Sequence, residues 1–276
     1  LRCLVGSEMC IRDRNSQHCG GTALSQTGKG PFLVFDNRRL SVYTNAEKLI
    51  QQEDRTMVQV DLITGFLGAG KTTFLRRYAA WWAGQGVKVC VLENDFGAVN
   101  VDAMLLQDLE AQGVELETIS GGCDCDTHQR RMRTKLISMA MRGFTRVLVE
   151  PSGIFDVDEF FDVLRDDPLD RWYQLGNVIA IVDALLPEQL SPQADYVLAS
   201  ECANAGLVLL SRSQLAKPGQ CEAAVAHLKR ALTACKCSRV FQPEEILAKD
   251  WAALTEADMA RIAPVSYTHL RAHETS

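Results

Sequence analysis

The segment VQVDLITGFLGAGKTT at residues 58–73 carries more structural information than any other in the chain. Its first part, Val58–Thr64, is mostly apolar, as expected of a strand in a sheet that is covered on both faces. Gly65–Thr72 then matches G-x-x-x-x-G-K-[ST], the phosphate loop that joins a strand to a helix. We therefore predict a strand, a phosphate loop, and a helix from Lys71 to about Ala83.

Each part of this loop has a role in holding a nucleoside triphosphate. The glycines allow backbone N–H groups to turn inward toward the phosphates, and the helix N-terminus adds partial positive charge. Lys71 can reach the β- and γ-phosphates, and the Thr72 hydroxyl can take one Mg²⁺ position. The predicted nucleotide-binding residues of the loop are Gly65, Gly68, Ala69, Gly70, Lys71, Thr72 and Thr73.

Beyond the loop, apolar strands alternate with helices along the chain. The pattern predicts helices at residues 101–112, 127–141 and 223–234, and strands at residues 87–92, 116–120, 146–150, 178–183 and 206–210. Such alternation is typical of a doubly wound α/β domain with a mostly parallel sheet. We assign residues 57–264 to one P-loop NTPase domain.

The two ends of the chain look foreign to this domain. Residues 3–14 resemble a translated sequencing adapter, and residues 265–275 resemble the same adapter read on its opposite strand. We therefore expect residues 1–14 and 265–276 to be artefacts, and the domain to be truncated at its C-terminus. Residues 15–56 form an N-terminal extension to which the sequence assigns no role.

Composition narrows the class of protein. The chain has 276 residues, 47% of them hydrophobic, and a formal net charge of −6. The excess of acid argues against a nucleic-acid partner, and no apolar run approaches the roughly 20 residues of a membrane helix. We find no signal peptide and expect a cytoplasmic protein. The ten cysteines include two tight pairs, which indicate metal or redox sites rather than disulfides.

A second Mg²⁺ element is predicted at the end of another core strand. Residues 146–150 read RVLVE, an apolar run that closes on Glu150. An acid in this place can lie on the Mg²⁺ side of a phosphate loop, although it could also serve as a capping residue. Gly153 follows three positions later, and its backbone N–H could approach the γ-phosphate and report its hydrolysis.

The first cysteine pair, Cys123 and Cys125, lies in a Gly-rich turn. Two thiolates one residue apart can share a soft or borderline cation. Here the chain resembles a known family through motifs that occur in order: GFLGAGKTT at 65–73, ENDFG at 93–97, GGCDC at 121–125, EPSG at 150–153 and VIAIVDA at 178–184. Together these motifs resemble the CobW-type GTPases, relatives of the GTPases that insert nickel into urease and hydrogenase.

The resemblance, over about residues 57–215, implies a definite chemistry. It implies that the chain binds GTP and Mg²⁺, hydrolyses GTP slowly, and holds Zn²⁺ or another transition metal at a C-x-C-C loop near the nucleotide. It also implies a client metalloprotein, since family members act as metallochaperones or in metal-cofactor assembly. By position, the phosphate and Mg²⁺ roles fall to Lys71, Thr72 and Glu150, the first switch segment contains Glu93 and Asp95, and the metal role falls to Cys123 and Cys125.

Two departures from the family pattern concern the switch and the metal loop. Asp95 stands where the usual N-E-[FY]-G pattern has Glu, and either Asp95 or Glu93 could orient the attacking water. Asp126 replaces the last cysteine of C-x-C-C, and a carboxylate can replace a thiolate on Zn²⁺. His128 could complete the metal set, although a lone surface histidine is more often solvated.

A third departure concerns the base. The guanine-reading N-K-x-D motif should follow Gly206–Leu210, where the chain instead has Ser211-Arg212-Ser213-Gln214. The aspartate that would accept hydrogen bonds from guanine is missing, and Gln214 offers one uncharged carbonyl acceptor. The preference for guanine is therefore weakened. The smaller C-terminal domain of the family is not evident either.

Three smaller features have alternative interpretations. Cys235–Cys237 could be a second metal pair, or could cap a helix or pack before a strand at Arg239–Phe241. The basic run Arg130–Arg133 is most simply a solvated helix face, although it could contact nucleotide or a partner. Of the adjacent Trp81 and Trp82, we expect one to pack and the other to be exposed, because neighbours cannot share one helical face.

Three hypotheses follow for the function. The first is a GTPase switch whose hydrolysis changes the metal affinity of the Cys123/Cys125 loop. The second is a metal-binding module in which nucleotide only stabilises the fold. The third is a P-loop ATPase or small-molecule kinase whose cysteines are structural. The altered base motif keeps this third hypothesis open.

Overall fold

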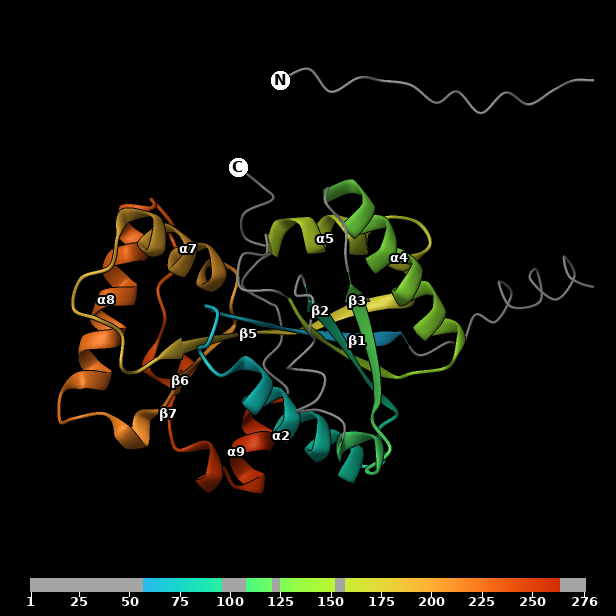
Figure 1. Cartoon of the computed structure of the whole chain (residues 1–276), viewed down its shortest axis with the longest axis horizontal. Coiled ribbons are helices and arrows are strands. Elements are labelled where there is room, and N and C mark those ends of the chain that lie inside the picture. Colours follow the sequence, from blue (N-terminus) through green and yellow to red (C-terminus); the bar gives the residue numbers. More distant parts are fainter. Residues whose placement is uncertain (1–56, 96–107, 121–124, 152–156, 264–276) are drawn as a thin grey trace, which may run out of the picture. The chain divides into compact units, whose positions relative to one another are not determined.

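The computed structural model describes residues 57–95, 108–120, 125–151 and 157–263 (Figure 1). They belong to the unit Asp54–Ser276, and the other unit of the chain, Leu1–Glu53, lies outside the described residues. A seven-stranded parallel sheet has the order β3-β2-β4-β1-β5-β6-β7. Its strands are β1 Val58–Thr64, β2 Val89–Asp95, β3 Glu115–Ser120, β4 Arg146–Glu150, β5 Tyr173–Asp183, β6 Leu207–Ser211 and β7 Ile246–Ala248. The predicted doubly wound α/β fold is confirmed.

Helices cover both faces of the sheet (Figure 1). In the described residues they include α2 Lys71–Gly84, α4 Cys125–Met141, α5 Val157–Arg165, α6 Leu169–Trp172, α7 Pro192–Ala203, α8 Gln220–Ala234 and α9 Glu256–Ile262, with 3-10 turns η1 Ser213–Leu215, η2 Pro243–Glu245 and η3 Trp251–Ala253. Residues 108–110 are also helical, and the rest of the expected helix at 101–112 lies mostly outside the described residues. Residues of α4, α5, α7 and α8 pack with Val60 and Leu62 of β1 in one apolar cluster. Residues of α2 and α9 pack with Ile63 in the other cluster, because alternate residues of a strand point to opposite faces.

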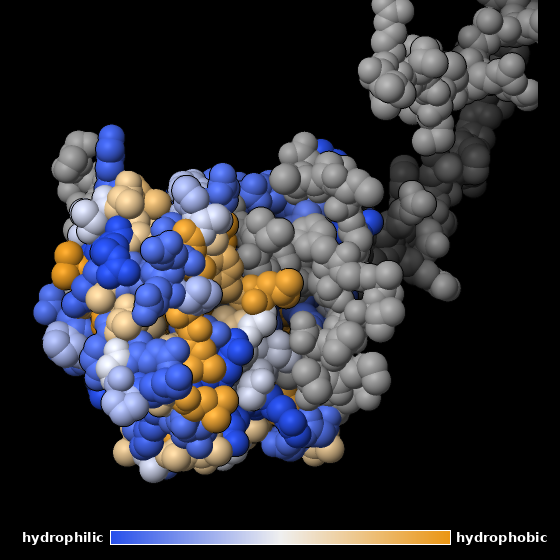
Figure 2. Space-filling model, turned by 60° about the vertical axis from the view of Figure 1, so that its left-hand side comes forward, coloured by the Kyte–Doolittle hydropathy of each residue, from blue (hydrophilic) through white to orange (hydrophobic). Residues whose placement is uncertain are grey.

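The exterior is mainly polar where it can be seen. Figure 2 brings the α7 and α8 side forward and shows hydrophilic residues with apolar ones gathered in a band near the middle. Large exposed apolar side chains of this part of the chain include Tyr196, Leu215 and Val240. Of the helices in the described ranges, none combines the length and the apolar character that crossing a bilayer requires.

A buried ion pair fixes the amino-terminal half of β1. Asp61 is fully buried and pairs with Arg146 of β4. Its carboxylate also accepts hydrogen bonds of 2.9 Å from the Tyr78 hydroxyl and from the Asn177 backbone N–H. The guanidinium of Arg146 lies 3.7 Å from the ring centroid of Trp82. The network therefore joins β1, β4, β5 and α2. Its additional contacts satisfy both buried charges, and a buried ion pair that lacked such contacts would be destabilising.

Three details differ from the sequence-based expectations. The prediction of a strand at Arg239–Phe241 is wrong, because this segment does not join the sheet. The Arg239 guanidinium instead donates to the Ala205 carbonyl. Among the described residues, the last strand is β7. The expected split between Trp81 and Trp82 is also wrong, since both are partly buried. Trp81 Nε1 donates a 2.7 Å hydrogen bond to Glu256 of α9, a helix that the sequence reading did not foresee.

The sheet brings the ends of its strands together at one edge. In the parallel register, Glu93 of β2 lies beside Glu150 of β4, and Asp95 lies beside Ser120, the last residue of β3. On the other side of β1, Asp183 of β5 lies beside Ser211 of β6. Ligands of open α/β sheets bind outside the carboxyl ends of the strands, so this edge is where a site is expected.

Candidate nucleotide and metal site

The phosphate loop is a tight backbone turn between β1 and α2. Gly65, Gly68 and Gly70 have φ values of 134°, 74° and 99°, in the left-handed region that favours glycine. A Cβ on Gly65 would lie 2.3 Å from the carbonyl oxygen of Ile181 in β5. Glycine is therefore needed at position 65 for two reasons, the backbone angle and the closeness of the neighbouring strand.

Lys71 lies over this turn. Its side chain is buried, and its Nζ donates hydrogen bonds to the carbonyl oxygens of Gly65 at 2.9 Å and Phe66 at 3.3 Å. The Ala69 N–H donates to the Phe66 carbonyl at 3.0 Å, which closes the turn. The ammonium is thus held at the loop, as the phosphate-binding role of Lys71 requires.

Thr72 and Glu150 come together as predicted. The Thr72 hydroxyl donates a 2.9 Å hydrogen bond to Glu150 Oε1, and both residues are buried. A hydroxyl and a carboxylate are oxygen ligands of the kind that Mg²⁺ takes in phosphate-binding sites. The pair therefore fits a Mg²⁺ ion beside the phosphate loop, and Thr72 and Glu150 are the residues that would hold it.

Two further acids were predicted near the phosphates. Glu93 is buried and lies beside Glu150 in the register of β2 and β4. It lies inside β2, together with Asp95, because this strand extends to Asp95 instead of ending at Leu92 as expected. The Asp95 side chain and Gly153 lie outside the described residues. Which acid orients water, and whether Gly153 meets the γ-phosphate, remain predictions.

Residues from distant parts of the chain brace the loop, and the sequence reading did not assign them. Glu201 of α7 accepts from the Gly65 N–H at 3.1 Å through its carboxylate. Trp251 of η3 packs on the far side, where a Cβ on Gly70 would lie 3.0 Å from its ring. Neither residue lies in a recognisable motif, so only the fold reveals that it contacts the loop.

Arg212 is the third residue that contacts the phosphate loop. It lies in the base segment, Ser211–Gln214, which stands where the guanine-reading motif is expected, and this position could have indicated a contact with the nucleotide site. Arg212 has a left-handed φ of 54° directly after β6. Its guanidinium donates a 2.8 Å hydrogen bond to the Gly68 carbonyl oxygen and forms an ion pair with Asp183 Oδ2 at 2.8 Å. Arg212 thus ties the base segment to the phosphate loop. Gln214, the predicted base-reading residue, is exposed in η1.

The metal loop lies mostly outside the described residues. Cys123 is not described, and Cys125 and Asp126 begin α4 with side chains that are not described. Their role as ligands therefore remains a prediction. His128 is buried, so its expected surface location is wrong, and burial lowers its pKa below the ordinary value. Within the described ranges, no three His, Cys, Asp or Glu residues gather as a metal-binding set.

The second cysteine pair forms a helix end. Lys236 has a left-handed φ of 58°, and its N–H donates to the Thr233 carbonyl at 3.0 Å. The Cys237 N–H donates to the Leu232 carbonyl at 2.9 Å. This is the hydrogen-bond pattern of a Schellman C-cap, so the helix-cap interpretation of Cys235–Cys237 is confirmed.

Known proteins match the same part of the chain. The family model for the "CobW/HypB/UreG, nucleotide-binding domain" matches residues 59–240. The zinc chaperone YjiA of Escherichia coli is 31% identical over 169 residues, 58% of this chain and 50% of YjiA. The zinc chaperone YeiR of the same organism is 32% identical over 165 residues, 59% of this chain and 48% of YeiR.

A eukaryotic relative is more distant. The zinc-regulated GTPase metalloprotein activator 1 of Dictyostelium discoideum is 27% identical over 146 residues, 45% of this chain and 29% of that protein. The chain spans about half the length of the two bacterial relatives. The family model nevertheless covers the phosphate loop, Glu150 and the base segment, so this chain belongs to the CobW/HypB/UreG family through its nucleotide-binding domain.

Proposed function

We propose that this chain is a GTP-binding and GTP-hydrolysing metallochaperone that couples hydrolysis to the transfer of Zn²⁺, or of another transition metal, to a client metalloprotein. The observation that carries the proposal is the Thr72–Glu150 hydrogen bond of 2.9 Å beside a phosphate loop that holds Lys71. Membership of a family whose relatives are named zinc chaperones supports the metal part.

Hydrolysis follows from the groups at the sheet edge. Backbone N–H groups of the loop bind the phosphates, and Lys71 exchanges the carbonyl oxygens of Gly65 and Phe66 for phosphate oxygens. Thr72 and Glu150 would hold Mg²⁺, which would supply charge neutralisation at the phosphates when bound. Glu93, buried beside Glu150, or Asp95 orients the attacking water. Preorganised positive charge of this kind is usually the largest contribution to catalysis.

The coupling to metal is supported by topology. Asp95, at the end of β2, lies in register with Ser120 at the end of β3. The segment after Asp95 and the segment that contains Cys123 therefore leave the sheet from neighbouring strands. A nucleotide-dependent change in one can bias the other. We place this activity in the cytoplasm, where a Cys-x-Cys pair stays reduced and able to bind metal.

Calorimetric titration of the full chain tests the proposal. GTP and ATP are each titrated with Mg²⁺, with and without Zn²⁺. We expect GTP to bind at least about tenfold tighter than ATP, or about 1.4 kcal/mol, and Zn²⁺ to change the GTP affinity. The double substitution Cys123→Ser and Cys125→Ser should abolish the Zn²⁺ effect and leave GTP binding intact. Equal affinities for both nucleotides together with no Zn²⁺ effect would refute the proposal.

A P-loop ATPase or kinase is the second candidate, and one observation favours it. The base segment has no carboxylate at residues 211–214, and the nearest candidate in the register, Asp183, is engaged by Arg212. A guanine base would then lose a charged acceptor. Equal binding of ATP and GTP would support this candidate. Tight Zn²⁺ binding with no nucleotide hydrolysis above background would instead support a metal-binding module.

A further inference from the structure

A basic groove runs between β3 and the first half of α4. It has a volume of about 510 Å³ and is lined by Thr118, Ile119, Thr127, Arg130, Arg131, Thr134 and Lys135. The lining contains three cationic side chains, of which Lys135 is paired with Glu117, and no acidic one, in a chain whose net charge is −6. Such a local excess of positive charge attracts anionic partners.

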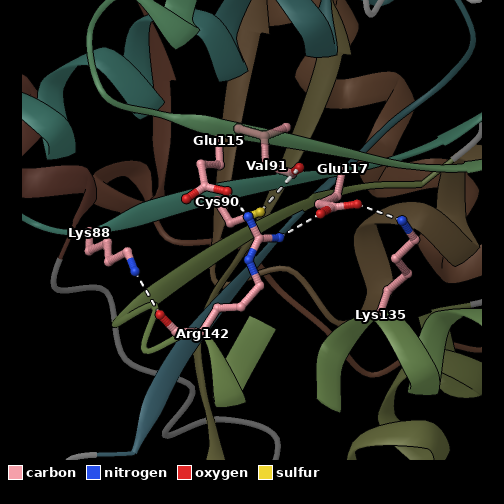
Figure 3. A network of polar contacts seen from close by, with 7 residues as sticks. All are labelled: Lys88, Cys90, Val91, Glu115, Glu117, Lys135 and Arg142. Atoms are coloured by element: carbon pink, nitrogen blue, oxygen red, sulfur yellow. Dashed lines mark hydrogen bonds and ion pairs between the residues drawn. The ribbon is translucent and has the colours of Figure 1, made fainter. Parts of the chain in front are cut away.

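The two carboxylates of β3, Glu115 and Glu117, form ion pairs with cationic side chains near the C-terminal end of α4. Figure 3 shows Glu115 and Glu117 facing Arg142, with Glu117 also facing Lys135. This network neutralises the amino-terminal half of β3 and holds α4 against it. Arg130 lies beyond the network, and within the described part of the chain its guanidinium has no carboxylate partner.

The same helix offers a contrast. Arg133 pairs with Asp166 at 3.6 Å and donates to the Asp167 carbonyl oxygen, so it faces the segment between α5 and α6. Of the basic run, Arg130 and Arg131 line the groove and Arg133 does not.

The groove lies along the edge of β3 rather than on one of its faces. Thr118 and Ile119 both line it, and consecutive residues of a strand point to opposite faces. β3 is the first strand in the sheet order and pairs only with β2 among the described strands. An extended peptide can add to such an edge through backbone hydrogen bonds, and this half of β3 carries no charged residue that would oppose it.

We propose that the edge of β3 at Thr118 and Ile119, with Arg130 and Arg131 of α4, binds an acidic extended segment of the protein that receives the metal. This inference rests on the proposed function for the identity of the partner. Chain connectivity supports it, since the segment 121–124, which contains Cys123, joins the two elements that form the groove. An acidic segment docked here is held at both ends of the predicted metal loop.

Binding of a designed peptide tests the groove without nucleotide or Zn²⁺. The probe is a fluorescein-labelled Glu-Thr-Glu-Thr-Glu-Thr peptide, whose glutamates share one face when it is extended. Its anisotropy is followed against the full chain at low salt. We expect binding that weakens as salt rises and that falls about tenfold with the double substitution Arg130→Glu and Arg131→Glu.

A matched control changes the same charge elsewhere. Lys229 and Arg230 are adjacent and exposed on α8, and their double substitution to Glu should leave peptide binding unchanged. Circular dichroism checks that each variant is folded, and the milder pair Arg130→Gln and Arg131→Gln should weaken binding in the same direction. Hydrogen exchange should show protection of β3 amides by the peptide.

Other outcomes would overturn the proposal. These are no peptide binding at low salt, equal losses in the α8 control, binding without protection of β3, binding of tripolyphosphate but not of the peptide, or tighter binding of a single-stranded oligonucleotide at the same arginines. The GTP and Zn²⁺ titrations are run on the same variants and should not change. A failure of the groove is thereby distinguished from a failure of the proposed function.

Discussion

Gly65 is the residue at which the fold and the site constrain each other most strongly. Its φ of 134° and the Ile181 carbonyl leave no room for a side chain. We expect Gly65→Ala to lower the free energy of unfolding by about 2–4 kcal/mol, measured by urea denaturation. Gly68→Ala is the matched control: it has a φ of 74° but open space around it, so its cost should stay near 1 kcal/mol, about the left-handed penalty alone. Equal costs would show that the contact with β5 does not matter.

Glu150 should govern the Mg²⁺ dependence of nucleotide binding. Glu150→Gln keeps the shape but removes the charge that the Thr72–Glu150 pair would offer to the ion. We expect the affinity for Mg²⁺-nucleotide to fall about 10–100-fold, and the affinity measured in EDTA to stay the same. Calorimetry under both conditions separates the two. A loss of similar size in EDTA would mean that Glu150 supports the loop and not the metal.

Arg212 should set the position of the phosphate loop. Arg212→Ala removes the hydrogen bond to the Gly68 carbonyl and the pair with Asp183, so we expect nucleotide affinity to fall about tenfold. Arg165 of α5 is a suitable control, since its side chain is exposed and pairs at 3.5 Å with Asp162 of its own helix. A fall in nucleotide affinity for Arg165→Ala as large as that for Arg212→Ala would contradict the assignment.

At the scale of elements, β2 is a strand buried on both faces, and this affects its cysteine. Burial raises the pKa of Cys90 from 9.0 to about 12. The unfolded chain therefore loses this proton at lower pH than the folded chain, so Cys90 contributes stability below about pH 9 that is lost as the pH rises toward 12. The stability difference between the native chain and Cys90→Ala should then shift with pH by up to about 1.4 kcal/mol per unit. Urea denaturation between pH 9 and 11 measures it, and a constant difference would refute it.

The strands could be predicted because apolar runs that follow turns have few alternatives. Some helices were missed although their signals are present: Ser191 caps α7 and accepts from the Ala194 N–H, and Thr255 forms a capping box with Asp258 in α9. α9 has 7 residues, too few to show a clear period, and the buried face of α7 includes Glu201, which interrupts its apolar pattern. The error at Arg239–Phe241 has another cause: Phe241 is buried by side-chain packing and Val240 is exposed, but the segment does not join the sheet.

The residues of the candidate site also divide into those that the sequence could predict and those that it could not. Lys71 and Thr72 could be placed because the phosphate-loop motif itself fixes their geometry, and Glu150 because it closes an apolar strand. Glu201 and Trp251 could not, because their contact with the loop depends on how α7 and η3 return to the sheet. Contacts between residues so far apart in sequence leave no local pattern in it.

At the scale of the whole molecule, the phosphate loop is where distant parts of the Asp54–Ser276 unit meet. Glu201, Arg212 and Trp251 reach it from α7, from the turn after β6 and from η3. Trp251 also packs against Phe74 of α2, with ring centroids 5.7 Å apart, and Trp81 of α2 donates to Glu256 of α9. A ligand that orders the loop should therefore stabilise segments that it does not touch.

Hydrogen exchange provides the test of this connection. Nucleotide at about 100 times its Kd stabilises the folded state by about 2.7 kcal/mol. We expect Mg²⁺-GTP to increase amide protection in α2 and also in the segment from Trp251 to Ile262. In Trp251→Ala the increase in α2 should remain, because Lys71 and the loop still bind phosphate, whereas the increase at residues 252–262 should fall sharply. Equal protection of that segment in both proteins would show that α9 is held by the core and not through the loop. A reduced effect in the variant would identify Trp251 as the contact through which the nucleotide acts on the C-terminal end of the domain.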